Sequence, residues 1–223
     1  MYIYQIEVSN HCSLTCSYCP HPFQARPKGL MTFATFRKCV ELFKNHCDNV
    51  ATLRLHNFGE VTLHPELPEF IRYARAEGVR CSFFTNGMRS RTQPHTERYW
   101  RELADAGLET VDFSAHVMST SEFRATTGNR VVIGRVYDPG AVVPGSWAGQ
   151  VGPAETPVPE PCIFQRMSAL VVLWDGRISS CCLDVEGQFE GLHVDDLLAG
   201  RRYRFTPIPL CSTCSSMRHE EAL

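Results

Sequence analysis

The cysteines are the residues of this chain whose type and spacing point most directly to chemistry. Eleven of the 223 residues are cysteines, well above their share in an ordinary globular domain. Eight fall into two groups near opposite ends of the chain, and three stand alone, at Cys39, Cys47 and Cys81. Because the count is odd and the chain is too long for a small disulfide-stapled domain, we expect the thiolates to be metal ligands or redox groups.

The first group places Cys12, Cys16 and Cys19 within eight residues, directly after a strand-like run. Three closely spaced thiolates favour an iron–sulfur cluster, although zinc accepts the same ligands when a fourth, such as His11 or His21, completes the shell. Three ligands leave one iron of a [4Fe-4S] cubane open to an outside molecule. An open coordination position distinguishes a catalytic metal site from a structural one.

The second group consists of Cys162, the adjacent pair Cys181 and Cys182, and the CxxC turn of Cys211 and Cys214. Between these cysteines, an Asp-Gly turn at 175–176 predicts a β-hairpin, and residues 194–204 predict a short helix. Four thiolates from a loop, a hairpin and a CxxC turn can complete a tetrahedral shell. Their spacing suits zinc and a fully ligated iron–sulfur cluster equally.

Between the cysteine groups, apolar strand runs alternate with amphipathic helical stretches, which is typical of βα units. We predict strands over 3–8, 52–56, 81–85, 111–114 and 131–136, and helices over 32–46, 67–77, 96–106 and 119–127, with Thr32 and Ser119 as N-caps. Five strands and four helices are too few for a closed eight-fold barrel. The predicted fold is α/β, an open partial (β/α) barrel of about five to six parallel strands with a small C-terminal β-hairpin and helix domain, and its site lies on loops at the carboxyl ends of the strands.

Residues 137–161 interrupt this alternation because Gly and Pro crowd the segment. A linker explains this composition, but a long ordered loop between catalytic elements is often a lid, with Trp147 as its anchor. The predicted organisation is a barrel domain over 1–136, a lid or linker over 137–161 and an auxiliary domain over 162–223.

Charge and hydropathy exclude several classes of protein. The 22 Lys and Arg against 24 Asp and Glu give a net charge of −2, which provides no basic surface for nucleic acid. No apolar run approaches the roughly 18 residues of a membrane span, and the first residues lack the blocks of a signal peptide. We therefore expect a cytoplasmic protein that binds neither nucleic acid nor membrane.

The first cysteine group resembles that of the radical S-adenosylmethionine (SAM) enzymes. Their CxxxCxxC motif, usually with an aromatic residue before the last cysteine, matches Cys12, Cys16, Tyr18 and Cys19. The resemblance implies a [4Fe-4S] cluster on these three cysteines, with SAM on the open iron. It also implies reductive cleavage of SAM to a 5′-deoxyadenosyl radical by an electron from a donor such as flavodoxin or ferredoxin.

Later segments extend the resemblance. The family has a GGEP-like turn that binds the methionyl amine of SAM, and Gly59 and Glu60 match it, whereas Phe58 and Val61 replace the usual Gly and Pro. A carboxylate there pairs with an ammonium, and a glycine lets the backbone approach a ligand closely. By the same resemblance, further SAM contacts come from loops and strands farther along the chain, at Asn86 of a TNG turn, Ser114, His116, Ile133 and Arg135.

The second cysteine group resembles the shortened SPASM element called a twitch domain, which in that family holds one auxiliary [4Fe-4S] cluster. The matching ligands are Cys162, Cys181, Cys211 and Cys214, with Cys182 as a competitor for the second place. The resemblance therefore implies two [4Fe-4S] clusters in addition to SAM.

A partial barrel with one auxiliary cluster is most similar to the radical SAM dehydrogenases that act on 2-deoxy-scyllo-inosamine. The implied function is oxidation of a polar small molecule, such as a sugar or cyclitol, with electron transfer to the auxiliary cluster. One alternative is a maturase or epimerase acting on a short peptide, in which Cys182, or else Cys39, Cys47 or Cys81, donates a hydrogen atom. Another is a non-catalytic protein with two zinc sites.

Overall fold

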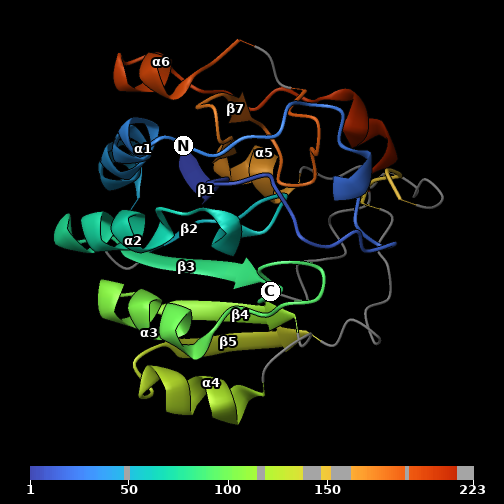
Figure 1. Cartoon of the computed structure of the whole chain (residues 1–223). Helices are drawn as coiled ribbons and strands as arrows, with labels where there is room; N and C mark the ends of the chain where they lie inside the picture. Colours follow the sequence, from blue (N-terminus) through green and yellow to red (C-terminus); the bar gives the residue numbers. More distant parts are fainter. Residues whose placement is uncertain (48–50, 115–118, 138–146, 152–161, 189–190, 215–223) are drawn as a thin grey trace.

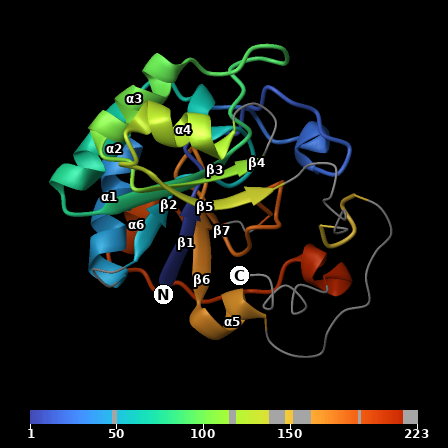
Figure 2. The ribbon, with the colours of Figure 1, turned by 90° about the horizontal axis from the view of Figure 1, so that it is seen from below.

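The computed structural model describes residues 1–47, 51–114, 119–137, 147–151, 162–188 and 191–214. Four parallel strands form one sheet in the order β2 (Thr52–Arg54), β3 (Arg80–Thr85), β4 (Thr110–Ser114) and β5 (Val132–Tyr137). In a second sheet, β1 (Tyr2–Ile6) is parallel to β6 (Ala169–Val172), which is antiparallel to β7 (Ile178–Ser179). Because β1 also contacts β2, the sheets form one curved array (Figures 1 and 2).

Helices α1 (Phe33–His46), α2 (Leu67–Ala76), α3 (Glu97–Ala106) and α4 (Thr120–Thr127) cover one face of this array (Figures 1 and 2). The C-terminal part adds α5 (Ile163–Met167) and α6 (Val194–Leu198), and α6 packs against α1. Short 3₁₀ helices are η1 (His21–Phe23), η2 (Val61–Leu63) and η3 (Pro209–Thr213). The predicted α/β partial barrel is confirmed. No described helix is long and apolar enough to cross a membrane.

Capping residues fix where the long helices begin. The side chains of Thr32, Thr96 and Ser119 each accept a hydrogen bond from a backbone N–H in the first turn, which satisfies one of the unpaired donors of a helix start. Ser119 forms a full capping box with Glu122. The predicted N-caps at Thr32 and Ser119 are therefore confirmed.

The main hydrophobic core lies between the sheet and the helices. The rings of Phe36 and Phe70 stack at 4.3 Å between α1 and α2, and Trp100 packs against Phe113 and Phe123. Cys39 and Cys81 belong to this core, where burial raises the pKa of each thiol to about 12. Both thiols are buried within packed side chains, which argues against either one donating hydrogen to a substrate, a role that stays a prediction.

A buried ion pair joins the end of β1 to the segment that follows the first cysteine group. Arg26 donates to both carboxylate oxygens of Glu7, through Nη1 at 2.8 Å and through Nη2. The Glu7 and Arg26 side chains are 0% and 4% exposed. Burial raises the pKa of the Glu7 carboxyl, and the guanidinium opposes that rise. Such a pair costs desolvation energy that only close geometry and full hydrogen bonding offset.

Residues 24–26 also contact the part of the chain that follows Cys181 and Cys182. Arg26 Nε and Gln24 Nε2 each donate to the Val185 carbonyl at 2.8 Å. The Glu186 carboxylate accepts from the backbone N–H groups of Ala25 and Arg26, at 2.8 and 3.0 Å. Segments about 160 residues apart in the sequence are thus held together by hydrogen bonds around one buried cation.

Replacing Arg26 with methionine tests this arrangement. Arg26→Met leaves the Glu7 carboxylate buried without its partner, so we expect the free energy of unfolding to fall by about 3–5 kcal/mol. Chemical denaturation of the reduced protein measures it. Lys44→Met is the control, because the Lys44–Glu77 pair lies on the surface and its loss should change little. Equal effects of the two substitutions would contradict the role given to Arg26.

Candidate functional site

The loop after β1 gathers the first three cysteines. Cys12, Cys16 and Cys19 are all partly buried. The pKa of Cys12 is raised to about 11, mainly by burial, with smaller contributions from Glu60 and from the nearby Cys19 and Cys16 thiols. Burial also raises the pKa of Tyr18, whose hydroxyl contacts Cys16. The loop therefore brings its three sulfurs within electrostatic reach of one another, as the sequence predicts.

The base of this loop is fixed by Asn10, which is fully buried. Its Oδ1 accepts from Gly29 N at 2.7 Å, and its Nδ2 donates to Gln24 Oε1 at 2.9 Å. The Asn10 carbonyl lies 2.8 Å from Nε2 of His21. This ties the chain before the cysteines to the chain after them. His21 is thus occupied with the backbone rather than turned toward the thiols.

Glu60 is a buried carboxylate, 2% exposed, held by four hydrogen bonds. Oε1 accepts from Thr62 N at 3.0 Å, from Thr62 Oγ1 at 2.6 Å and from Thr85 Oγ1 at 2.5 Å. Among the described residues, Oε2 accepts only from Asn86 N, at 2.7 Å. Because Oε1 accepts three hydrogen bonds and Oε2 one, Oε2 is the oxygen with acceptor capacity left for an incoming donor.

Gly59 lets this carboxylate approach the cysteine loop. Its φ of 108° favours glycine, and a Cβ there would lie 2.6 Å from the Ser9 carbonyl oxygen and 2.7 Å from Asn10 Cα. The next residue, Glu60, donates its backbone N–H to the His11 carbonyl at 2.6 Å. The close approach at Gly59 is to the cysteine loop itself, and the Glu60 carboxylate in turn raises the pKa of Cys12.

The TNG turn completes the same corner. Besides its backbone bond to Glu60, Asn86 directs Nδ2 to Cys12 Sγ at 3.7 Å and accepts from Met88 N through Oδ1 at 2.8 Å. Ser13 Oγ donates to the Met88 carbonyl at 3.0 Å. The loops after β1, β2 and β3 thus meet at one edge of the sheet, where the partial-barrel prediction put the site.

The other predicted cofactor contacts are less closely grouped. Ser114 ends β4 and is partly exposed, while His116 lies outside the described residues. The Ile133 side chain packs against the helix-side core. Arg135 is exposed, and its backbone N–H donates to Asp112 Oδ1 at 2.6 Å. The cofactor roles of these residues stay predictions.

The second cysteine group assembles from three elements. Cys162 precedes α5, Cys181 follows β7, and Cys211 and Cys214 lie within and at the end of η3. Burial raises the pKa of Cys211, a backbone hydrogen bond at Ile208 opposes the rise, and the thiols of Cys181, Cys162 and Cys214 add to it. Cys182, like Cys162, packs with the cluster of Phe164, Ala169, Val171 and Leu173, whereas Cys181, Cys211 and Cys214 pack with Ala148, Ile208 and Leu210. The surroundings of the two adjacent cysteines therefore differ.

A turn at 147–151 connects the two cysteine groups (Figures 1 and 2). Trp147 Nε1 donates to the Tyr18 carbonyl at 2.8 Å, and its ring lies 5.6 Å from that of Phe58. Thr213 Oγ1 donates to the Ala148 carbonyl at 2.5 Å. Trp147 and Ala148 have φ of 49° and 59°, a strained region for residues other than glycine that surrounding contacts must maintain. Most of 137–161 lies outside the described residues, so a lid stays a prediction.

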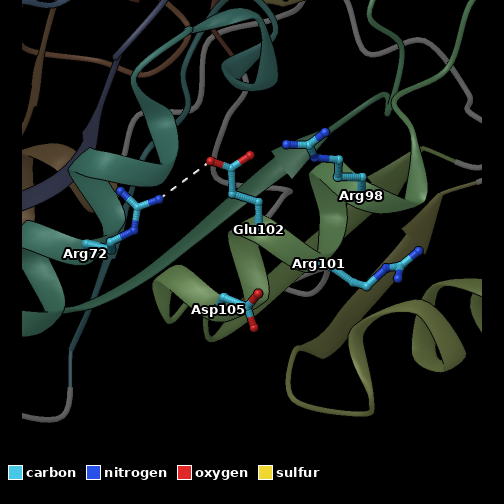
Figure 3. Close-up of a pocket in the computed structure, with 5 residues that line it drawn as sticks. All are labelled: Arg72, Arg98, Arg101, Glu102 and Asp105. Carbon is cyan, nitrogen blue, oxygen red and sulfur yellow. Dashed lines mark ion pairs between the residues drawn. The ribbon is translucent and has the colours of Figure 1, made fainter.

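A cavity of about 570 Å³ lies elsewhere, between α2 and α3 on the outer helix layer (Figure 3). It is lined by Arg72, Arg98, Arg101, Glu102 and Asp105. Arg72 and Glu102 form an ion pair at 3.6 Å, and Asp105 pairs with Arg130. Because these charges sit on the helices rather than at the strand ends, the cavity is not part of the cysteine site.

Residues 6–138 match the family described as the radical SAM superfamily. This span is more than half of the chain. The protein belongs to the radical SAM superfamily. Within the described ranges, no three His, Cys, Asp or Glu side chains are grouped so as to hold a single metal ion. Thiolates of a [4Fe-4S] cubane each bind a different iron atom, so they need not converge on one point.

Similar proteins include the tungsten-containing aldehyde ferredoxin oxidoreductase cofactor-modifying protein of Pyrococcus furiosus, 27% identical over 57% of this chain and 34% of that protein. PqqA peptide cyclase of Xanthomonas campestris is 31% identical over 49% of this chain and 27% of its own length. Neomycin C epimerase of Streptomyces fradiae is 27% identical over 37% and 26%. The matched part thus spans about a third or less of these relatives.

Two solved structures share the fold. BtrN in complex with AdoMet and 2-DOIA superposes with a TM-score of 0.64, at 19% identity over 86% of this chain and 77% of that one. Native anSMEcpe with bound AdoMet and the Cp18Cys peptide has a TM-score of 0.54, at 13% identity over 96% and 86%. The radical SAM assignment and the BtrN-like fold are therefore confirmed.

The family implies a [4Fe-4S] cluster and SAM, and this radical SAM protein has residues that fit both. Three partly buried thiols converge on one loop. Beside them lies a buried carboxylate with a remaining acceptor position, suited to an ammonium. The backbone at Gly59 lies so close to the base of the cysteine loop that no side chain fits between the two segments.

Sequence reasoning missed Glu7, Arg26 and Arg54. A signal existed for Glu7, because a carboxylate inside a buried apolar run requires a partner. Arg26 gave no such signal, since its partner is 19 residues away and its other contacts come from the far end of the chain. Arg54 occupies a partly exposed strand position that any polar residue could fill.

Replacing Gly59 tests the joint between the Gly-Glu turn and the cysteine loop. Gly78→Ala is the matched control, because Gly78 also has a positive φ, of 78°, but no atom lies within 4 Å of its added Cβ. We expect Gly78→Ala to destabilise by about 1–2 kcal/mol through backbone strain. Gly59→Ala should lower the free energy of unfolding by about 1–3 kcal/mol more than Gly78→Ala does, because its added methyl group overpacks the contact with the cysteine loop. Chemical denaturation measures both losses. Equal losses would contradict the close approach.

Proposed function

We propose that this protein is a radical SAM oxidoreductase that oxidises a polar small molecule, sugar- or cyclitol-like, and uses an auxiliary [4Fe-4S] cluster as electron acceptor. The observation that carries the proposal is the four-thiol group of Cys162, Cys181, Cys211 and Cys214, tied to the first cysteine loop through the 147–151 turn. A second fully ligated cluster beside the first is what a two-electron oxidation needs.

Different residues would hold the clusters, bind SAM and exclude water. Cys12, Cys16 and Cys19 would hold the first cluster, and the four later cysteines would hold the second. Glu60 would accept the SAM ammonium at Oε2, in a position that its other hydrogen bonds fix in advance. The Trp147 and Phe58 rings would cover this corner and limit access of water.

When bound, the first cluster with SAM supplies the one-electron chemistry that removes a hydrogen atom from an unactivated carbon, and a second cluster supplies the acceptor for the remaining electron. The first electron must come from outside, and a flavodoxin or ferredoxin is the proposed donor. The fold likeness to BtrN, whose structure holds 2-DOIA, supports a small-molecule substrate.

An epimerase is the second candidate, because Cys182 is a fifth thiol beside the four proposed ligands and lies near Tyr4 on the other side of β6 from the helices. Cys182 would then return a hydrogen atom to the substrate. A peptide substrate is the related alternative, supported by the peptide cyclase among the relatives. Turnover in D₂O separates these chemistries, because an epimerised product carries one solvent deuterium at the inverted carbon and an oxidised product carries none.

The role of Glu60 is tested by SAM affinity. Glu60→Gln removes the negative charge that would pair with the SAM ammonium, and a hydrogen bond to a charged group contributes about 1.5–3 kcal/mol. We therefore expect SAM to bind roughly 10- to 150-fold more weakly, measured by equilibrium dialysis with the reconstituted protein. Glu69→Gln, on the exposed side of α2, should leave the affinity unchanged. Unchanged affinity in Glu60→Gln would exclude the proposed contact.

The two cysteine groups are tested by separate substitutions. After anaerobic reconstitution, the wild type should contain about eight iron atoms, and Cys16→Ala and Cys211→Ala about four each. Cys16→Ala should abolish 5′-deoxyadenosine formation because SAM loses its cluster. Cys211→Ala should still form some 5′-deoxyadenosine but no oxidised product. Cleavage at the wild-type rate in Cys16→Ala, or zinc in place of iron, would reject the proposal.

A further inference from the structure

An irregularity in β1 places two neighbouring polar residues on the face of the sheet opposite the helices, called the inner face here. The pairing of β1 with β6 shifts register between Ile3 and Gln5. Ile3 and Ile6 both pack into the helix-side core, whereas Tyr4 packs against Phe164, with ring centroids 5.0 Å apart. Such an irregularity re-aims side chains that strict alternation would separate. Tyr4 and Gln5 therefore both reach the inner face.

Arg54, at the end of β2, joins them there. Its guanidinium lies 4.8 Å from the centroid of the Tyr4 ring, and the side chain is partly buried. Among the described residues no carboxylate forms an ion pair with Arg54. By contrast, the buried Arg26 is paired with Glu7, and the exposed Arg80 is paired with Glu109.

Among the described residues, none of the side chains in contact with Arg54 carries a negative charge. His56 Nδ1 accepts from Phe84 N at 3.1 Å, so its proton sits on Nε2, which lies 2.9 Å from the Gln5 amide. Burial lowers the pKa of His56 to about 3, which keeps the ring neutral. Burial raises the pKa of Tyr4, which keeps the phenol neutral. On β4, Asp112 accepts the backbone N–H of Arg135.

The Gln5 amide adds a donor. With the amide in one orientation, its Nε2 faces the protonated Nε2 of His56, so that two donors meet, and its buried Oε1 has no partner among the described residues. Turning the amide over lets Oε1 accept from His56, because the two amide ends are interchangeable by shape. The NH₂ group then occupies the unpartnered position. A cation, an amide and a phenol thus share one patch, in which no described residue supplies a carboxylate to Arg54.

We propose that Arg54 binds a carboxylate of the substrate on the inner face of β1 and β2. A partly buried guanidinium without a counter-charge favours an anionic ligand, and its planar fork matches a carboxylate through two parallel hydrogen bonds. The inference rests on the proposed function and narrows its substrate to an acid, such as a sugar acid or an acidic residue of a short peptide. Arg54 is then a specificity-determining residue.

Matched acid and neutral probes test the proposal on the reconstituted holoprotein. Glucuronate is compared with glucose, and N-acetylaspartate with N-acetylasparagine, by titration calorimetry. In at least one pair we expect the acid to bind about tenfold or more tightly than its neutral partner, as a charge-assisted pair requires. Arg54→Gln should abolish this preference and Arg54→Lys should keep part of it. Arg80→Gln, which changes a surface pair, should retain it in full.

Each outcome of these titrations either supports the proposal or overturns it. No acid preference in either pair, or one that persists in Arg54→Gln, overturns the proposal. SAM affinity is measured on the same samples, and a fall in Arg54→Gln as large as the loss of acid binding would show that the anion is the SAM carboxylate, which also overturns it. Failure of the proposed oxidation would be seen separately, as absent 5′-deoxyadenosine in the wild type, because the probe titrations need no turnover.

Discussion

The arrangement of the whole site depends on one buried charge pair, between Glu7 and Arg26. A carboxylate at the end of a buried strand is tolerated only when a cation meets it in close geometry. Arg26 meets that demand from the segment directly after the first cysteines, and its Nε–H donates to the Val185 carbonyl. A single electrostatic requirement therefore fixes the path of the chain on both sides of the site.

The consequence is that the two cysteine groups belong to one packed body rather than to two loosely joined parts. The contacts of Glu186 with 25–26 hold them together on one side, and those of Trp147 and Thr213 on the other. Strand β6, from the C-terminal part, is hydrogen-bonded to β1 of the N-terminal part. A substitution at either cysteine group should therefore also alter the structure around the other group through these contacts.

Much of the fold could be read from the sequence because its signals are local. Thr32 and Ser119 cap helices through residues three positions away, and the strand runs are bounded by turns. The cysteine loop and Gly59–Glu60 were found because spacing along the chain carries that information. Partners such as Arg26 and Val185 could not be found, since their contact depends on how β6 packs beside β1. The difference in surroundings between Cys181 and Cys182 is likewise set by tertiary packing, not by spacing.

The two faces of the sheet explain why the polar groups of the site are where they are. One face is closed by α1–α4, and its thiols, Cys39 and Cys81, are buried in the hydrophobic core. Among the described residues, no such helix layer covers the inner face on β2 to β4, and polar strand residues such as Arg54 and His56 point there (Figures 1 and 2). The register shift in β1 extends that polar surface toward Cys182, while the loops at the strand ends carry the first three cysteines. A substrate bound on the inner face would therefore lie between the two cysteine groups, which is the geometry that hydrogen removal at one group and electron transfer to the other requires.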